Sequence, residues 1–222
     1  MLDILFVSDF VCPYCLVAEA ALKKALELTS LPAQITWQPL ELTMEPSPRV
    51  DTWNDLVRRS HYQVLVEPCR KLGLAMKLPP HVVPRPYTRP AIEAWYFAQE
   101  QGKGDAWKDA MYHAYFMEEK DIGEIDVLCE IAASLGMNAS MLRVCLEDGV
   151  YTDAEREAVL YSRNVLKVKG VPTIYINGQQ VEQEAYTVEE MAELLQAFAS
   201  GENMTAEASG AAFHGCGPDG CC

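Results

Sequence analysis

The sequence has few basic residues: 18 Lys and Arg against 32 Asp and Glu give the 222-residue chain a net charge of −14. Nucleic acids and anionic membrane surfaces attract basic patches, so the sequence predicts neither as a partner. It lacks any apolar run of the roughly 18–20 residues that a membrane-spanning helix needs. The start, MLDILFVSDF, has no basic region before its apolar residues and predicts no signal peptide. We therefore expect a cytoplasmic protein, in which disulfides are usually transient and catalytic.

Strand and helix patterns alternate at the start of the chain. The run LDILFVS at residues 2–8 is typical of a strand buried on both faces. From Cys12 to about Ser30 the apolar residues recur at helical spacing, and AQITWQPLEL at residues 33–42 alternates like a second strand. Strand, helix and strand within 42 residues predict a βαβ unit.

Helical patterns dominate the middle of the chain. We expect Thr88 and Asp105 to cap two of these helices, and Ser140 to open another. The aromatic residues of this region are interpreted as core of the helical part rather than as a substrate pocket: Trp95, Tyr96, Phe97, Tyr112, Tyr115 and Phe116.

The last third returns to mixed elements. DAEREAVLYSRNVLKVKG predicts a helix, and VPTIYINGQQVE predicts a hairpin because Asn177-Gly178 is a strong turn signal between strands. TVEEMAELLQAF predicts a final helix, with Thr187 and Glu190 as its capping box.

The order of these elements predicts the fold class. With the helical middle removed, the chain runs strand, helix, strand, helix, strand, strand, helix, which is the order of a thioredoxin fold. We therefore expect an α/β protein, a thioredoxin fold with a large α-helical insertion. The predicted thioredoxin-like domain spans 1–45 and 150–199, the helical insertion domain spans 46–149, and a flexible Cys-rich tail spans 200–222.

The stretch CPYC places Cys12 and Cys15 at the junction of the first predicted strand and helix. Two cysteines with this spacing in a βαβ pattern are typical of a thioredoxin-like redox site. The first amide groups of a helix have no partner within the helix, so they stabilise a thiolate at Cys12 and make it the attacking sulfur. Cys15 lies one turn further in, and we expect it to be the more shielded, resolving thiol. Pro13 suits the first helical position.

A second candidate element is the stretch KGVPTIYING, in which Pro172 opens a predicted strand. A proline is tolerated there because it need not donate a hydrogen bond to the sheet. An ordinary edge-strand proline and an active-site proline both fit this pattern.

Four motifs, in their order along the chain, resemble those of the DsbA-like thioredoxin-family oxidoreductases of the FrnE type. This family is related to 2-hydroxychromene-2-carboxylate isomerases and kappa-class glutathione transferases. The motifs are SDFVCPYC, ITWQPLEL, AYFMEEKDIGEIDVLCEIAASLGM and GVPTIYING. The resemblance spans about residues 1 to 198. It implies dithiol–disulfide exchange with Cys12 as nucleophile and Cys15 as resolver.

The resemblance also implies a substrate-binding set beside these cysteines. Pro172 would be in the cis form and lie against the cysteine pair, and the backbone of Val171 would pair with a bound substrate segment. Pro13 and Tyr14 complete the set. The substrate is then a disulfide or a dithiol, on a protein or on a small thiol.

The related transferases and isomerases use a single Ser or Cys at the first motif position to handle glutathione. This sequence keeps both Cys12 and Cys15, which favours redox exchange. A glutathione-dependent transferase or isomerase stays open as an alternative.

The tail holds a second cysteine cluster, GCGPDGCC, with Cys216, Cys221 and Cys222. Some FrnE-type proteins resemble this in carrying a second C-x4-C pair. The tail could deliver a second redox dithiol to the first one, because a tether raises its effective concentration to roughly millimolar. Alternatively, the three thiolates and His214 form a Cys3His metal or metalloid site. Incidental oxidation of a disordered tail is the third interpretation.

The sequence predicts no tightly bound cofactor and no other metal site. Glutathione or another thiol reductant could recycle the cysteine pair, and a homodimer stays open. Asp9 either tunes the thiolate or caps the following helix. The remaining cysteines are expected to be inert core residues: Cys69, Cys129 and Cys145.

Overall fold

The computed structural model describes residues 1–181 and 187–201. Its strands are β1 (Leu2–Ser8), β2 (Ala33–Pro39), β3 (Thr173–Ile176) and β4 (Gln179–Gln180). The helices begin with α1 (Pro13–Thr29) and end with α9 (Val188–Ser200). Between them lie α2 (Leu56–His61), η1 (Tyr62–Leu65), α3 (Val66–Leu72), α4 (Arg89–Glu100), α5 (Gly104–Phe116), α6 (Ile125–Ser134), α7 (Ala139–Glu147), α8 (Thr152–Leu160) and η2 (Tyr161–Val165).

The described strands form one mixed sheet in the order β2-β1-β3-β4. β1 pairs in parallel with β2 and in antiparallel with β3, and β3 pairs in antiparallel with β4. β1 is therefore a central strand, which is why its sequence is almost entirely apolar. The predicted hairpin is confirmed: Asn177 and Gly178 both have positive φ, at 52° and 79°, as a two-residue hairpin turn requires.

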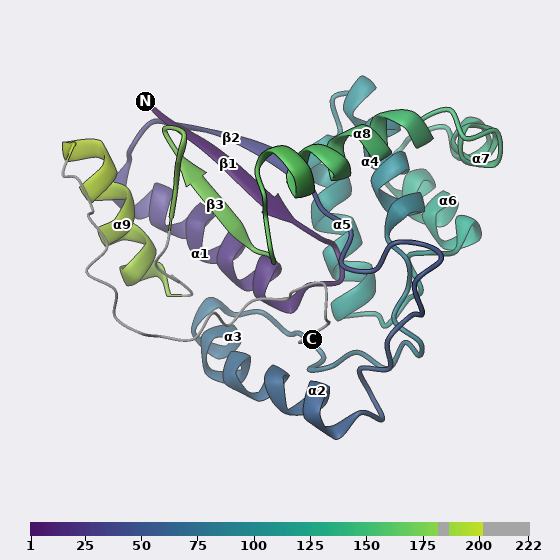
Figure 1. The fold of residues 1–222 in the computed structure, drawn as a ribbon, viewed down its shortest axis with the longest axis horizontal. Helices are drawn as coiled ribbons and strands as arrows, with labels where there is room; N and C mark the ends of the chain where they lie inside the picture. Colours follow the sequence, from purple (N-terminus) through teal and green to yellow (C-terminus); the bar gives the residue numbers. More distant parts are fainter. Residues whose placement is uncertain (182–186, 202–222) are drawn as a thin grey trace.

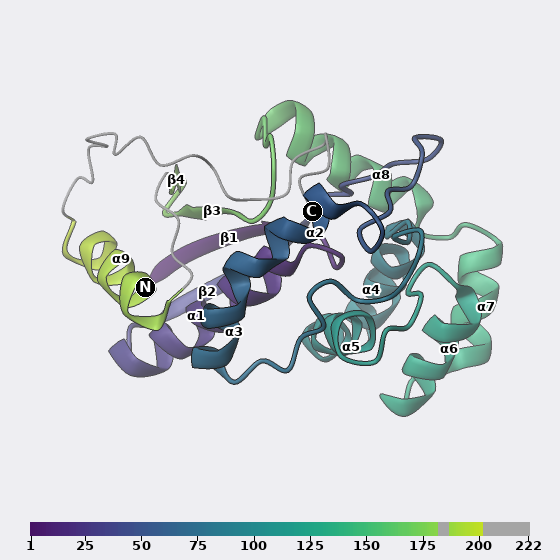
Figure 2. The same ribbon diagram turned by 90° about the horizontal axis from the view of Figure 1, so that it is seen from below.

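The helices gather in two groups around this sheet. α1 and α9 pack side by side, and α8 contacts β2. Helices α4 to α7 lie at the opposite end of the molecule from α9 (Figures 1 and 2). The α/β thioredoxin architecture with many added helices is as the sequence predicts. Within the described residues, no helix is long and apolar enough to cross a membrane.

The predicted caps are partly confirmed. Thr187 and Glu190 form the expected capping box of α9. Thr88 stands at the N-cap of α4 as expected, but its side chain makes no capping hydrogen bond. Two expected starts are wrong. α5 begins at Gly104, so Asp105 lies in its first turn, where it pairs with Lys108 at 3.1 Å. α7 is capped by Asn138 rather than opened by Ser140, because the Asn138 side chain accepts the Met141 amide.

The aromatic residues of the middle region form core, as predicted. Trp95, Tyr112, Tyr115 and Phe116 are buried. Trp95 packs on Trp37 of β2 with the ring centroids 4.6 Å apart. This contact joins the added helices to the sheet, so the two parts share one hydrophobic core.

A buried ion pair joins α1 to α5. The Lys108 ammonium lies 3.4 Å from the Glu19 carboxylate, and both residues are 4% exposed. Lys23, which is more exposed, contacts the same carboxylate at 3.1 Å. Glu19 lies one turn after Cys15 on α1, so this pair fixes the added helices against the helix that carries the cysteine motif.

We expect Lys108→Met to lower the free energy of unfolding by roughly 3 kcal/mol, because it removes one partner of a buried ion pair. Urea denaturation followed by circular dichroism measures this change. The control variant Lys23→Met should cost less than about 1 kcal/mol, since the Lys23 side chain is 43% exposed and its second partner, Asp109, is 64% exposed. Equal losses in the two variants would contradict a special role for the buried pair.

Candidate functional site

The CPYC motif lies where β1 ends and α1 begins. Cys12 is the N-cap residue of α1, in extended conformation with φ −91° and ψ 114°, and Pro13 occupies the first helical turn. Cys15 follows within that turn, and its amide donates to the Cys12 carbonyl at 3.2 Å. The predicted placement at the N-terminus of a helix is therefore confirmed, and the first-turn amides of α1 surround the motif.

The second predicted element lies directly beside this motif. The Cys12 thiol donates a hydrogen bond to the Val171 carbonyl, with 3.4 Å between Sγ and O. The Val171–Pro172 peptide bond is cis, and β3 begins at the next residue, Thr173. The fold thus brings together two segments that are 159 positions apart in the sequence.

Both thiols of the motif are buried. Cys12 and Cys15 are each 0% exposed. The expectation that Cys15 is more shielded than Cys12 is therefore wrong for this structure. Both residues are equally inaccessible, and the Cys12 sulfur is in contact with the Val171 carbonyl.

Burial raises the pKa of the Cys15 thiol well above its usual value. The hydrogen bond and the charge of the neighbouring Cys12 raise the pKa of Cys15 further. Cys15 is therefore protonated at neutral pH, as suits a sulfur that reacts second.

Tyr14 holds a helix of the added region against the site. Its ring is 4% exposed, and its hydroxyl donates to the His61 carbonyl at the end of α2, at 2.9 Å. Pro13 is buried, whereas Pro172 is half-buried. The substrate-binding roles expected for Pro13, Tyr14, Val171 and Pro172 stay predictions.

Asp9 lies beneath the cysteine motif and is fully buried. Its carboxylate accepts the Leu42 amide at 2.6 Å, and α1 has no side-chain cap at Cys12, so Asp9 does not cap α1. Burial raises the pKa of Asp9, while the Leu42 amide and the charge of Arg85 oppose the shift. Asp9 thereby ties the segment after β2 to the base of the site.

Arg85 is a buried cation that sequence reasoning missed. It is 1% exposed and donates to the Thr43 hydroxyl at 3.1 Å. Its charge also acts on Tyr62, whose pKa is raised by burial. Arg85 stands in a proline-rich loop with no motif around it, so no signal in the sequence marks it.

A pair of buried carboxyl groups lies on the side of the site next to α8. Glu41 follows β2, and Glu155 lies on α8; the residues are 3% and 1% exposed. The two side chains share a hydrogen bond. Burial and mutual repulsion raise the pKa of Glu41 to about 9, and burial raises that of Glu155 to about 7. The pair therefore holds a proton at neutral pH.

The other cysteines among the described residues lie on helices α3, α6 and α7. Cys69 and Cys129 are buried in the core, and Cys145 is partly buried. Among the described residues, no three His, Cys, Asp or Glu side chains gather in a way that would hold a metal ion. His214, Cys216, Cys221 and Cys222 lie outside the described residues.

Sequence comparison assigns most of the chain to one family. The DSBA-like thioredoxin domain matches residues 3–198. An uncharacterized protein of Bacillus subtilis, YwbO, is 34% identical over 170 residues, which cover 76% of this chain and 84% of YwbO.

Structure comparison finds the same fold in an oxidoreductase and in an isomerase. A probable DsbA oxidoreductase from Streptomyces coelicolor superposes with a TM-score of 0.74 at 24% identity, covering 100% of this chain and 99% of the other. A 2-hydroxychromene-2-carboxylate isomerase superposes with a TM-score of 0.68 at 17% identity, covering 89% of this chain and 95% of the other. At these identities the structural similarity shows the fold alone. The reaction has to be argued from the residues of the site.

The Glu41–Glu155 pair makes stability depend on pH. Both pKa values are raised in the folded state, so the folded chain binds more protons than the unfolded chain between about pH 5 and 9. We therefore expect the free energy of unfolding to fall as the pH rises from 6 to 9.

Glu155→Gln should reduce this fall by at least ~1 kcal/mol, measured by urea denaturation at each pH. Glu157→Gln, an exposed change on the same helix, should leave the fall unaltered. Identical pH profiles for Glu155→Gln and the wild type would contradict the assignment.

Proposed function

Because the chain belongs to the DSBA-like thioredoxin domain family, we propose that it is a thiol–disulfide oxidoreductase that uses Cys12 and Cys15. The observation that carries this proposal is the contact between the Cys12 sulfur and the Val171 carbonyl. It places the sulfur at the N-terminus of α1 and beside the residue that precedes β3, where an extended substrate segment can pair with the backbone. We place this activity in the cytoplasm.

The reaction proceeds in two displacements. The Cys12 thiolate attacks one sulfur of a substrate disulfide, and the other substrate sulfur leaves and takes up a proton. Cys15 then gives up its proton and attacks the Cys12 sulfur, which releases the second substrate thiol. The substrate gains two electrons and two protons, and the protein ends as a Cys12–Cys15 disulfide. The reverse sequence oxidises a dithiol substrate.

The groups around the sulfurs suit this order of events. The first-turn amides of α1 favour negative charge at Cys12. The raised pKa of Cys15 keeps that sulfur protonated until the mixed disulfide has formed. We propose that Pro13, Tyr14, Val171 and Pro172 border the substrate. No bound cofactor is needed, because glutathione or another thiol can reduce the pair again.

A glutathione-dependent transferase or isomerase is the second candidate, since the fold is shared with 2-hydroxychromene-2-carboxylate isomerase. The two candidates differ in their need for Cys15. Exchange requires it as the resolving sulfur, whereas a transferase that handles glutathione at Cys12 does not.

We expect Cys15→Ser to accumulate a mixed disulfide between Cys12 and glutathione and to lower turnover on a dithiol substrate by at least about 100-fold. A glutathione redox titration with alkylation and peptide mass mapping measures both effects. Cys145→Ser, which changes a partly buried cysteine on α7, serves as the matched control and should keep full turnover. Full activity of Cys15→Ser would favour the transferase or isomerase instead.

We further propose that the tail cysteines act as an internal partner of the Cys12–Cys15 pair. Cys216 lies fifteen residues beyond Gly201, a length of chain that extends to roughly 50 Å. α1, against which α9 packs, has 17 residues and is about 26 Å long. The tail is thus long enough to return from the end of α9 to the start of α1.

We expect the combined change Cys216→Ser, Cys221→Ser and Cys222→Ser to slow turnover several-fold while Cys12 still reacts with an alkylating reagent. Steady-state turnover and timed alkylation with mass spectrometry measure the two effects. Unchanged turnover would contradict the relay. Stoichiometric zinc on the purified wild type that is lost in this variant would support the metal site instead.

A further inference from the structure

Basic residues are concentrated in two segments of this acidic chain. Residues 49–89 hold eight Lys and Arg against three Asp and Glu, although the whole chain has a net charge of −14. Residues 161–172 hold Arg163, Lys167 and Lys169 and no acidic residue. More than half of all Lys and Arg residues therefore lie in two short stretches.

One part of each segment flanks the cysteine motif, on opposite sides; within the first segment Arg85 is buried, and Arg70 and Arg89 pair with carboxylates. The first is held to the start of α1 by the hydrogen bond from Tyr14 to His61. The second leads into Val171, which accepts the Cys12 thiol. In Figure 1 the start of α1 accordingly lies between α2 below and the segment from η2 to β3 above.

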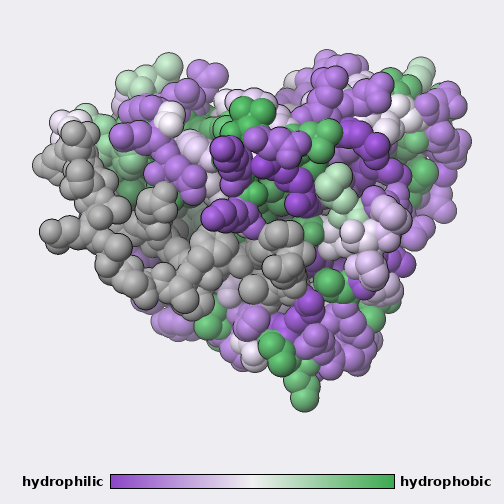
Figure 3. Space-filling model, viewed as in Figure 1, coloured by the Kyte–Doolittle hydropathy of each residue, from purple (hydrophilic) through white to green (hydrophobic). Residues whose placement is uncertain are grey.

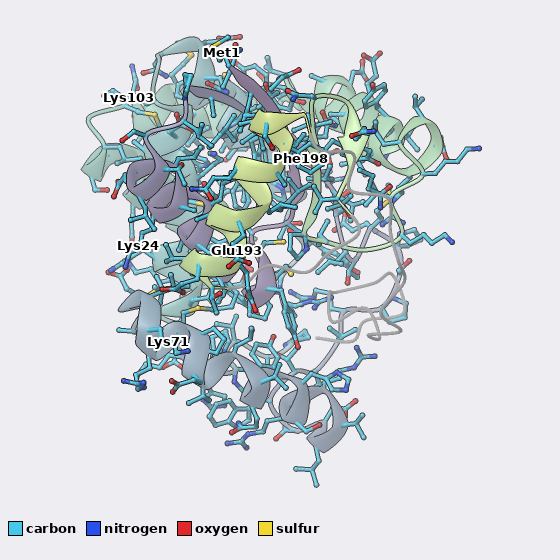
Figure 4. All side chains as sticks on the ribbon, turned by 90° about the vertical axis from the view of Figure 1, so that its left-hand side faces the viewer. Met1, Lys24, Lys71, Lys103, Glu193 and Phe198 are labelled. Atoms are coloured by element: carbon cyan, nitrogen blue, oxygen red, sulfur yellow. The ribbon has the colours of Figure 1, made fainter. Side chains whose placement is uncertain are left out.

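The helical run from α2 to α3 lies parallel to α1. Its middle is tied to Tyr14 at the start of α1, and its end is tied to Lys24, whose ammonium donates to the Leu72 carbonyl at 2.7 Å. Figure 4 shows Lys24 on α1 and Lys71 on α3 on the same side of the molecule. Because His61 aligns with the start of α1, residues 56–59 extend past the cysteine motif.

This projecting end is both apolar and basic. Leu56 and Val57 are 77% and 69% exposed, and Arg59 stacks on Trp53 with 4.5 Å between the guanidinium carbon and the ring centroid. Hydrophobic atoms project over α2 at the lower tip of the molecule in Figure 3. On the opposite side, Tyr161 and Val165 are 45% and 62% exposed. We call these two surfaces together the cationic rim, formed by residues 53–61 and 161–169. The rim holds five Lys and Arg and one carboxylate, Asp55, which pairs with Arg58 at 3.3 Å; Arg59, Lys167 and Lys169 are exposed.

The end of this chain has the complementary chemistry. No Lys or Arg of this sequence follows Lys169, and residues 202–222 carry Glu202, Glu207 and Asp219, together with the apolar Met204 and Phe213. The segment is long enough to reach the rim from Gly201. Its attachment keeps its effective concentration in the millimolar range, so weak contacts are enough for docking.

We propose that residues 202–222 dock on the cationic rim and compete there with external substrates. Cys12 is 0% exposed, so a substrate sulfur reaches it only after segments around the site move apart. The docking does not require the exchange chemistry, so it can be tested with the tail cysteines removed.

Hydroxyl-radical labelling of the full-length chain, read by mass spectrometry, tests this docking. Both forms to be compared carry Cys216→Ser, Cys221→Ser and Cys222→Ser, which removes any disulfide tether. The second form also carries Glu202→Lys, Glu207→Lys and Asp219→Lys. At low salt we expect labelling of Leu56, Val57 and Tyr161 to be at least about twofold higher in the second form, because the rim repels a basic tail. At 1 M salt, where the Debye length is about 3 Å, the two forms should label alike.

Met141 and Val144 of α7 provide the internal control. They are 52% and 49% exposed, and neither belongs to the rim. Their labelling should be the same in both forms. Adding Arg59→Glu and Lys167→Glu to the form with the basic tail should restore protection of Leu56 and Tyr161. In that form the acidic charges lie on the rim and the basic charges on the tail, so the two surfaces attract each other again.

Equal labelling of the rim in the two forms at low salt would overturn the proposal. Protection of the rim by a separate acidic peptide, added to the solution, would not rescue it. A failure of the Cys12–Cys15 exchange in redox titration would not change these labelling results. The two hypotheses can therefore fail separately.

Discussion

The arrangement of the candidate site depends on the antiparallel pairing of β1 with β3, in which Val7 lies opposite Thr173. β1 ends just before the cysteine motif, and β3 begins just after the Val171–Pro172 peptide. Aligning these two strands therefore places the end of one beside the start of the other. The contact between the Cys12 thiol and the Val171 carbonyl follows from this register rather than from any local preference of either segment.

Helices outside the sheet determine what surrounds the sulfurs. Tyr14 attaches α2 to the start of α1, and the Lys108–Glu19 pair attaches α5 one turn further along the same helix. α1 thus carries the cysteine motif at one end and the contacts to the added helices along its side. A change in the position of these helices would alter the walls of the site without touching a cysteine.

Short-range patterns predicted the parts of the structure that local chemistry decides. The CPYC motif at a helix start, the Asn177-Gly178 turn and the Thr187 capping box each depend on neighbouring residues. The first turn of α7 was misplaced because Asn138 and Ser140 are both good caps. The burial of Cys12, the Arg85 cation and the Glu41–Glu155 pair could not be predicted, since each depends on segments that meet only after folding. Glu41 and Glu155, for example, come from the end of β2 and from α8.

The uneven charge of the molecule has a consequence for how partners arrive. The chain has a net charge of −14, while Arg59, Lys167 and Lys169 are exposed on the two sides of the cysteine motif. An anionic partner would be repelled by the larger part of the surface and attracted by one small part, so the field would turn it toward the sulfurs during diffusion. Such orientation before contact raises the rate of association more than it raises affinity, and it weakens as ions screen the field. A cationic partner would instead be held at the acidic surface, away from Cys12.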